Sequence, residues 1–224
     1  MGASEARATR ARTAVLISGR GSNLAALIDA CARPDAAAEI ALVISNRPDA
    51  AGIAHARAAG IPVETIDHRG VEARKEFDRS LSKALEVHEI RLICLAGFMR
   101  VLGAWFTGRW RDRLLNVHPS LLPAFPGLDT HRRALAAGVR FSGCTVHFVR
   151  AEVDAGPIIV QGVVPVHADD TPETLAARVL QAEHRCYPLA LELVASGRAR
   201  VEGESVVIEN IGAPDAMVIN PAPA

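Results

Sequence analysis

The sequence predicts an α/β fold: an open, mostly parallel twisted sheet flanked by helices, with an antiparallel strand pair in its C-terminal half. From Thr13 to about Val117, short β-branched runs alternate with longer stretches of helical spacing, the pattern of βαβ units around a parallel sheet. Two apolar runs joined by a turn then follow each other, as in a strand pair. The 224 residues are 50% hydrophobic, which is enough for one compact unit with a sizeable core.

Short apolar runs are the predicted parallel strands: AVLIS (14–18), ALVIS (41–45), PVETI (62–66), RLICLAG (91–97) and RLLNVH (113–118). In the segments between them apolar residues recur at three and four positions, so we expect helices that cover both faces of the sheet. These helical segments are NLAALIDACA (23–32), AAGIAHARAAG (50–60) and VEARKEFDRSLSKALEVH (71–88).

After residue 118 the pattern changes to a proline-rich loop, a helical segment at 130–138, and the strand pair CTVHFV (144–149) and PIIVQGVVPV (157–166). A long helix is predicted to follow, with Thr171 as its N-cap, Pro172 in its first turn and Gly197 ending it. Pro188 lies inside this run, so we expect it to kink the helix or divide it in two.

Composition argues for a small-molecule ligand. The formal net charge is +0 and the pI is about 7.1, so no long-range field favours nucleic acid or an anionic membrane. No stretch approaches the roughly 20 apolar residues of a membrane span. The first dozen residues, MGASEARATRAR, lack a signal-peptide core, so we expect a frayed N-terminus and a cytoplasmic protein.

Neither cysteine nor histidine spacing predicts a metal site. The four cysteines are far apart and form no C-x-x-C pair, so buried reduced thiols are expected rather than disulfides or zinc ligands. The histidines show no H-x-x-x-H or H-E-x-x-H spacing, and we therefore expect no metal.

The first motif is LISGRGSNL (16–24), a predicted strand that ends in glycines and opens into a helix. Backbone N–H groups at such a turn favour a phosphate. Leu24 stands where a dinucleotide fingerprint needs its third glycine, and a Walker ending is absent. A phosphate monoester site that includes Ser22 and Asn23 is one interpretation. A tight strand-to-helix turn, with Ser22 as an ordinary helix cap, is the other, and it carries about equal weight.

The second motif is NVHPSLLPAFPG (116–127), where an imidazole stands between a predicted strand and a proline-rich loop. Asn116 and His118 are two residues apart and so share one face of the strand. The end of a parallel strand is where open α/β sheets bind ligands. An amide and an imidazole there could stabilise an oxyanion and manage a proton, although a structural histidine is the commoner reason for this placement.

Two further segments carry candidate site residues. Asp154, in EVDAGPII, lies in the turn before a strand; near His118 it would hold the imidazole tautomer and favour its protonated form. An aspartate before Ala-Gly-Pro is otherwise an ordinary turn former. In LAGFMRVL, Met99 and Arg100 end another apolar run at the same predicted sheet edge, where they either line a pocket or simply punctuate a strand-to-helix connection.

Taken together, LISGRGSNL, LAGFMRVL, LLNVHPSLLPAFPGLDTHRRAL, GCTVHFV and VDAGPIIVQ resemble the phosphoribosylglycinamide formyltransferase family, folate-dependent enzymes of purine synthesis. The resemblance runs in order from about Ala14 to Gly197 and implies a Rossmann-like formyltransferase fold. The residues themselves, rather than the resemblance, predict a flexible N-terminus at 1–12 and a tail after residue 203, with one domain expected at 13–203. The domain would comprise a phosphate-binding half (13–112) and a catalytic and folate-binding half (113–203), followed by a tail at 204–224.

The resemblance also implies roles for individual residues. Asn116, His118 and Asp154 correspond to the family's catalytic trio, and Gly21, Ser22 and Asn23 to its phosphate-binding turn. Glu183 corresponds to the glutamate that holds the glycinamide end of the substrate. Residues that correspond to positions contacting formyl-folate are Arg74, Met99, Arg100, Val101, Leu102, Asn116, Arg150, Ala151, Glu152, Val153 and Asp154.

The implied reaction is direct formyl transfer from 10-formyltetrahydrofolate, a co-substrate, to the amine of glycinamide ribonucleotide, without a metal. Small molecules are then the partners, with no nucleic acid or membrane, in a monomer or homodimer. Related methionyl-tRNA formyltransferases usually continue after SLLP with an RWRG-type segment and a basic second domain, whereas this chain reads PAFPG. A formyltetrahydrofolate hydrolase and a non-catalytic nucleotide-phosphate sensor are the alternatives.

Overall fold

The computed structural model describes residues 10–67, 74–210, 212 and 218–220. Seven strands form the main sheet: β1 (Ala11–Ile17), β2 (Ala38–Ser45), β3 (Val63–Thr65), β4 (Leu92–Leu95), β5 (Leu114–His118), β6 (Phe141–Phe148) and β7 (Ile158–Pro165). The helices are α1 (Ser22–Cys31), α2 (Ile53–Ala58), α3 (Arg74–Val87), α4 (Ala104–Arg109), α5 (Thr130–Ala136) and α6 (Pro172–Ala195). Each strand and helix expected from the sequence is present, and residues 71–73 of the expected third helix lie outside the described residues.

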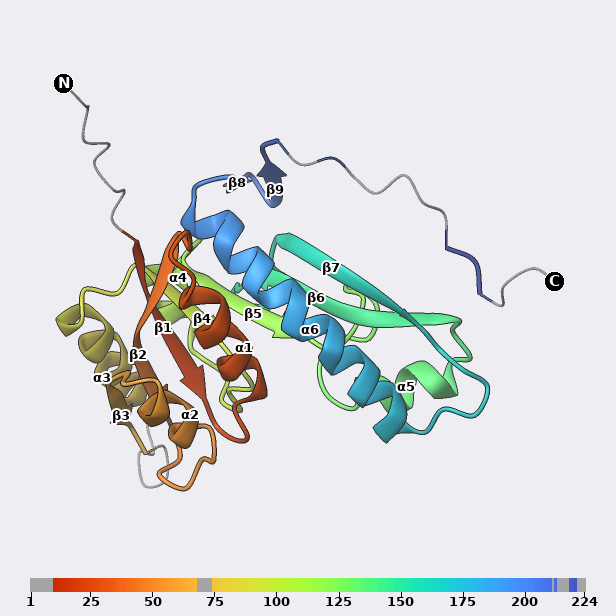
Figure 1. The fold of residues 1–224 in the computed structure, drawn as a ribbon, viewed down its shortest axis with the longest axis horizontal. Coiled ribbons are helices and arrows are strands. Elements are labelled where there is room, and N and C mark those ends of the chain that lie inside the picture. The colour runs from red at the N-terminus through yellow and green to blue at the C-terminus, as the bar shows by residue number, and fades with distance from the viewer. Residues whose placement is uncertain (1–9, 68–73, 211, 213–217, 221–224) are drawn as a thin grey trace.

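The order of strands across the sheet is β3-β2-β1-β4-β5-β6-β7. The pairs among β1 to β5 are parallel, whereas β6 pairs antiparallel with both β5 and β7. The open, mostly parallel sheet with an antiparallel strand pair in its C-terminal half is therefore confirmed (Figure 1). The strand order reverses at β1: β2 and β3 lie on one side of this strand, and β4 and β5 lie on the other. At such a reversal, loops on the two sides diverge and leave a crevice at the carboxyl edge.

Helices cover both faces of the sheet, as the helical spacing predicts. One apolar cluster joins α1 and α6 to the sheet through residues such as Leu24, Val179 and Val146. A second cluster joins α3 and α4 to the opposite face through residues such as Leu81 and Phe106. Side chains of a strand alternate between faces, and a strand covered on both sides needs apolar residues at nearly every position. This explains the continuous apolar runs of β1 and β4.

α6 begins with the predicted cap. The Thr171 side chain accepts from the Thr174 N–H, and Thr174 bonds back to the Thr171 N–H in a capping box. Gly197, just beyond the helix, has φ 76°, a value that glycine adopts without strain. Of the two expectations for Pro188, division of the helix is wrong, because α6 is continuous from Pro172 to Ala195. Apolar side chains on both sides of the proline are buried in the same core, and this packing outweighs the lost backbone hydrogen bond.

The sequence did not predict α4 or a small C-terminal hairpin. The strands β8 (Ala199–Glu202) and β9 (Ser205–Ile208) pair antiparallel across Gly203, which has φ 65°. Residue 203, the expected end of the domain, thus lies within the turn of this hairpin. In the turn, Glu204 lies 2.7 Å from an Arg111 nitrogen and 3.3 Å from Arg150 Nε. Among the described residues, no helix is both long and apolar enough to cross a membrane.

Candidate active site

The turns after β1, β4 and β5 lie beside one another at the carboxyl edge of the sheet. In the parallel ladder, Leu16 of β1 is opposite Leu95 of β4, and Leu95 is opposite Asn116 of β5. The turns that follow these residues therefore start at the same level. The Met99 N–H donates to Ser18 Oγ at 2.8 Å, which ties two of the turns together. This is the edge at which open α/β sheets bind ligands.

Asn116, His118 and Asp154, the expected catalytic residues, are brought together by β5 and by the loop after β6. Asp154 Oδ2 lies 3.3 Å from His118 Nδ1. Asp154 Oδ1 lies 3.8 Å from Nε2 of His147, which in turn is 3.3 Å from Asn116 Nδ2. The three expected residues thus belong to one connected cluster, with His147 between Asn116 and the carboxylate.

The position of Asp154 depends on a specific backbone path. Asp154 has φ 56°, and its Oδ2 also accepts from the Gly127 N–H at 2.8 Å. Two residues later, a Cβ added to Gly156 would lie 1.6 Å from the Phe148 carbonyl oxygen, so only glycine allows this close approach. The Ala-Gly-Pro turn is therefore both a turn former and the support of a buried carboxylate.

Both ring nitrogens of His118 face hydrogen-bond acceptors. Nδ1 faces the Asp154 carboxylate, and Nε2 lies 3.0 Å from the Phe125 carbonyl oxygen. The residue is only 5% exposed. A ring that carries hydrogen on both nitrogens can donate to both partners. The expected pairing of His118 with a carboxylate is thus present in the geometry.

His147 is a site residue that the sequence analysis did not single out. Its Nδ1 lies 3.0 Å from the Phe148 carbonyl oxygen, which assigns the ring hydrogen to Nδ1 and leaves Nε2 to accept from the Asn116 amide. Burial lowers the pKa of His147, which favours this neutral form. The sequence offers only the alternating pattern of β6, whereas the antiparallel register places His147 opposite Asn116.

The loop after His118 is held by hydrogen bonds to β6 and β7. Thr145 Oγ1 donates to the Ser120 carbonyl at 2.7 Å and accepts from the Leu122 N–H at 3.0 Å. Gln161 Nε2 donates to the Leu122 carbonyl at 2.9 Å. These bonds, beyond the prolines that the sequence predicts to stiffen the loop, fix the backbone next to the imidazole.

The glycine turn after β1 has the backbone that a phosphate site needs. Gly21 is the N-cap of α1, with φ 77° and no side-chain capping bond, so the alternative in which Ser22 caps the helix is wrong. A Cβ added to Gly21 would lie 2.5 Å from Gly52 Cα, and the Gly52 N–H donates to the Gly19 carbonyl at 2.9 Å. Two glycine backbones thus meet here, and the first N–H groups of α1 point away from the helix.

Asn23 and Glu183 contact each other across α1 and α6. Asn23 Nδ2 donates to Glu183 Oε2 at 2.7 Å, while Asn23 Oδ1 is buried without a hydrogen-bond partner among the described residues. Burial raises the pKa of Glu183, and the bond from Asn23 opposes this shift. The expected phosphate ligand and the expected glycinamide ligand are therefore neighbours at one end of the carboxyl edge of the sheet.

Tyr187 places Glu183 and was not predicted from the sequence. Its hydroxyl oxygen lies 3.0 Å from the carbonyl oxygen of Leu95, the last residue of β4, and 3.1 Å from that of Leu115 in β5. Residues four apart share one face of a helix. Tyr187 thus fixes α6 on the sheet such that Glu183, one turn earlier, reaches the carboxyl edge.

The residues expected to contact formyl-folate lie on two loops and at the start of α3. Met99 and Val101 are 74% and 53% exposed, whereas Leu102 is 7% exposed. Arg100 stacks its guanidinium 4.2 Å from the centroid of the Phe77 ring. On the loop after β6, Arg150 pairs with Asp112 at 2.8 Å. The remaining expected contacts are exposed side chains: Arg74, Ala151, Glu152 and Val153.

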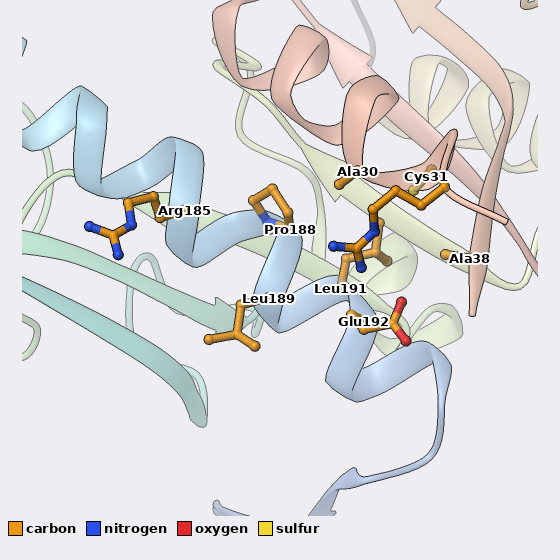
Figure 2. Close-up of a pocket in the computed structure, with 9 residues that line it drawn as sticks. Ala30, Cys31, Ala38, Arg185, Pro188, Leu189, Leu191 and Glu192 are labelled. Carbon is orange, nitrogen blue, oxygen red and sulfur yellow. The ribbon is translucent and has the colours of Figure 1, made fainter. Parts of the chain in front are cut away.

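A cavity of about 220 Å³ lies elsewhere, between the end of α1 and the middle of α6 (Figure 2). Cys31, Pro188 and Glu192 are among its lining residues, and none of the expected site residues is. It adjoins the last turn of α1, about 15 Å along that helix from the glycine turn. The cavity is therefore separate from the cluster around His118. Within the described part of the chain, His, Cys, Asp and Glu residues form no group that could hold a metal ion.

Comparisons with known proteins place the chain in one family. The formyl transferase family model matches residues 11–191. A phosphoribosylglycinamide formyltransferase of Escherichia coli (strain K12) is 45% identical over 84% of this chain and 88% of its own length. The trifunctional purine biosynthetic protein adenosine-3 of Gallus gallus is 53% identical over 86% of this chain, but the chain spans only 19% of that protein's length.

A solved structure shares the fold as well. The glycinamide ribonucleotide transformylase 1 of Symbiobacterium toebii superposes with a TM-score of 0.86 at 47% identity, covering 89% of this chain and 94% of the other.

Proposed function

This chain belongs to the formyl transferase family, and we propose that it transfers the formyl group of 10-formyltetrahydrofolate to the amine of glycinamide ribonucleotide. The products are formyl-glycinamide ribonucleotide and tetrahydrofolate, in purine biosynthesis. The observation that carries this proposal is the connected cluster of Asn116, His147, Asp154 and His118 at the carboxyl edge of the sheet.

Two ends of the carboxyl edge of the sheet match the two substrates. The N–H groups at the start of α1 and the hydroxyl of Ser22 bind the phosphate of glycinamide ribonucleotide, and the buried Glu183 binds its amine-bearing end. Met99 and Val101 offer exposed apolar surface to the fused rings of the folate. The reacting amine and formyl group then meet near Asn116 and His118, between these two ends.

Attack by the amine on the formyl carbon forms a tetrahedral oxyanion. Asn116 stabilises this oxyanion with the amide hydrogen that it does not give to His147, and protonated His118 supplies the nearby positive charge. Asp154 sustains that charge from the opposite side of the ring. The attacking nitrogen loses one proton, and the departing folate nitrogen gains one. A water beside Asp154 can carry the proton between these two nitrogens. The C–N bond to the folate breaks and the new formamide remains.

The experiment follows the ultraviolet absorbance of deformylated folate with purified protein and 10-formyltetrahydrofolate. Glycinamide ribonucleotide is added halfway through the trace. Product that appears only after the addition supports the proposal. Product before it indicates the hydrolase, and no product at all with bound ribonucleotide indicates the sensor.

Two variants test the site itself. His118→Ala is expected to lose activity about a hundred- to a thousandfold while its circular dichroism stays that of the wild type. His167→Ala, which removes an exposed histidine outside the cluster, is the control and should retain full turnover. Wild-type turnover in His118→Ala would remove His118 from the mechanism.

A further inference from the structure

In the segment between β4 and α4, exposed and covered side chains alternate from Met99 to Leu102. Met99 and Val101 are exposed, whereas Arg100 packs on the Phe77 ring and Leu102 is buried in the core. One side of this segment therefore rests on the protein, while the other faces outward. The two outward side chains therefore keep their exposure only as long as the inward side of the segment stays attached.

Hydrogen bonds hold the segment at both ends. At its start, the Met99 N–H donates to Ser18 Oγ at the end of β1. At its end, the Gly103 N–H donates to Asp78 Oδ2 of α3 at 2.9 Å. A Cβ added to Gly103 would lie 2.6 Å from the same carboxylate oxygen, so the backbone rests directly on it.

Asp78 lowers the stability of the fold by its burial in this position. It is 2% exposed, and its Oδ1 has no hydrogen-bond partner among the described residues. Burial raises its pKa, while the Gly103 N–H and the charges of Arg100 and Arg74 lower it. A buried carboxyl with one unpaired oxygen costs stability, so packing alone gives no reason for an aspartate here.

We propose that Asp78 is a positioning residue for formyl-folate: it supports the Met99–Leu102 segment from behind and keeps Met99 and Val101 presented to the ligand. Asp78 does not touch the folate. Its carboxylate fixes the end of the segment by accepting from the Gly103 N–H. This inference rests on the proposed function and names a determinant of folate affinity that lies outside the expected contact residues.

The test measures the binding of 10-formyltetrahydrofolate by calorimetry without an acceptor, so that it does not depend on formyl transfer. Asp78→Ala should weaken binding about tenfold, because an ordered segment becomes free to move. Asp78→Asn should stay within about threefold of the wild type, because its amide oxygen can still accept from Gly103. In turnover, KM for the folate should rise in Asp78→Ala, with kcat and KM for glycinamide ribonucleotide nearly unchanged.

A readout on the free protein checks the cause. Hydrogen exchange at the Gly103 amide should accelerate in Asp78→Ala and not in Asp78→Asn. Ser82→Ala is the matched control, since Ser82 is buried on the same helix and accepts from Trp110 Nε1 at 3.1 Å. It should lower stability and leave folate affinity unchanged.

If Asp78→Ala does not fold, Gly103→Ala replaces it. Gly103 has φ −79°, which alanine adopts, and the added Cβ would displace the carboxylate instead. The proposal would be overturned by faster hydrogen exchange at the end of the segment with unchanged folate affinity. It would also be overturned if the binding of both substrates weakened equally. Wild-type folate binding without transfer would contradict the proposed function and leave the Asp78 inference standing on its binding data.

Discussion

Replacing Asp154 by asparagine is expected to remove one charge from the site and keep its hydrogen bonds. The asparagine oxygen can take the place of Oδ2, which accepts from the Gly127 N–H at 2.8 Å and lies 3.3 Å from His118 Nδ1. The asparagine NH₂ then faces His147 Nε2, the acceptor 3.8 Å from the present Oδ1. Asparagine also tolerates the φ of 56° at this position. The fold should therefore survive with a change of about 1 kcal/mol.

The expected effect on catalysis follows from the distance. Two unit charges 3.3 Å apart interact by about 5 kcal/mol at an effective dielectric constant of about 20. Part of this is offset because the neutral ring is less costly to bury. We therefore expect kcat to fall about a hundred- to a thousandfold, or about 3–4 kcal/mol in activation free energy.

The assay is steady-state folate absorbance between pH 5.5 and 8.5, with urea unfolding to confirm the fold. Asp112→Asn is the matched control, because Asp112 has φ 59° and pairs with Arg150, not with His118. It should retain turnover within about threefold. A kcat of Asp154→Asn within threefold of the wild type would refute the reasoning, since the charge would then be dispensable.

Other residues give independent tests. Burial raises the pKa of Glu183 above 4.5, so the folded state holds a proton that the unfolded chain releases, and stability should fall as pH rises above that value. Glu183→Gln should flatten this slope, by at most about 1.4 kcal/mol per pH unit, in urea unfolding between pH 4.5 and 8; an unchanged slope contradicts the assignment. Gly21→Ala should lower the melting temperature and raise KM for glycinamide ribonucleotide at least about tenfold. Gly60→Ala is its control, since Gly60 has φ 68° but nothing within 4 Å of an added Cβ; equal losses in both would mean that only backbone strain matters. Tyr187→Phe should cost about 1–3 kcal/mol in urea unfolding, because the buried hydroxyl hydrogen that the Leu95 and Leu115 carbonyls share is lost; an unshifted midpoint would show that this hydrogen bond does not stabilise the fold.

Local patterns in the sequence were sufficient for most of the fold. The alternation of β-branched runs with helical spacing predicted β1 to β5, and two apolar runs joined by a turn predicted β6 and β7. Thr171, Pro172 and Gly197 marked the ends of α6 because capping chemistry involves only neighbours in the chain. Pro188 led to the wrong prediction that the same helix is divided, because a local rule does not take into account the burial of side chains on both sides of the proline.

The spacing of Asn116 and His118 predicted a shared strand face because the period of a strand is fixed by its backbone. The partner of each side chain was not predictable. His147 faces Asn116 through antiparallel register, Tyr187 reaches the carbonyls of β4 and β5 from α6, and Asp78 supports a segment that follows β4.

What the sequence determined by itself is therefore the order of strands and helices along the chain and the residue types at their ends. Only the tertiary structure decided which of those ends meet. The physical reason is that periodicity and capping depend on a few adjacent residues, whereas strand order, register and helix docking depend on packing summed over the whole core.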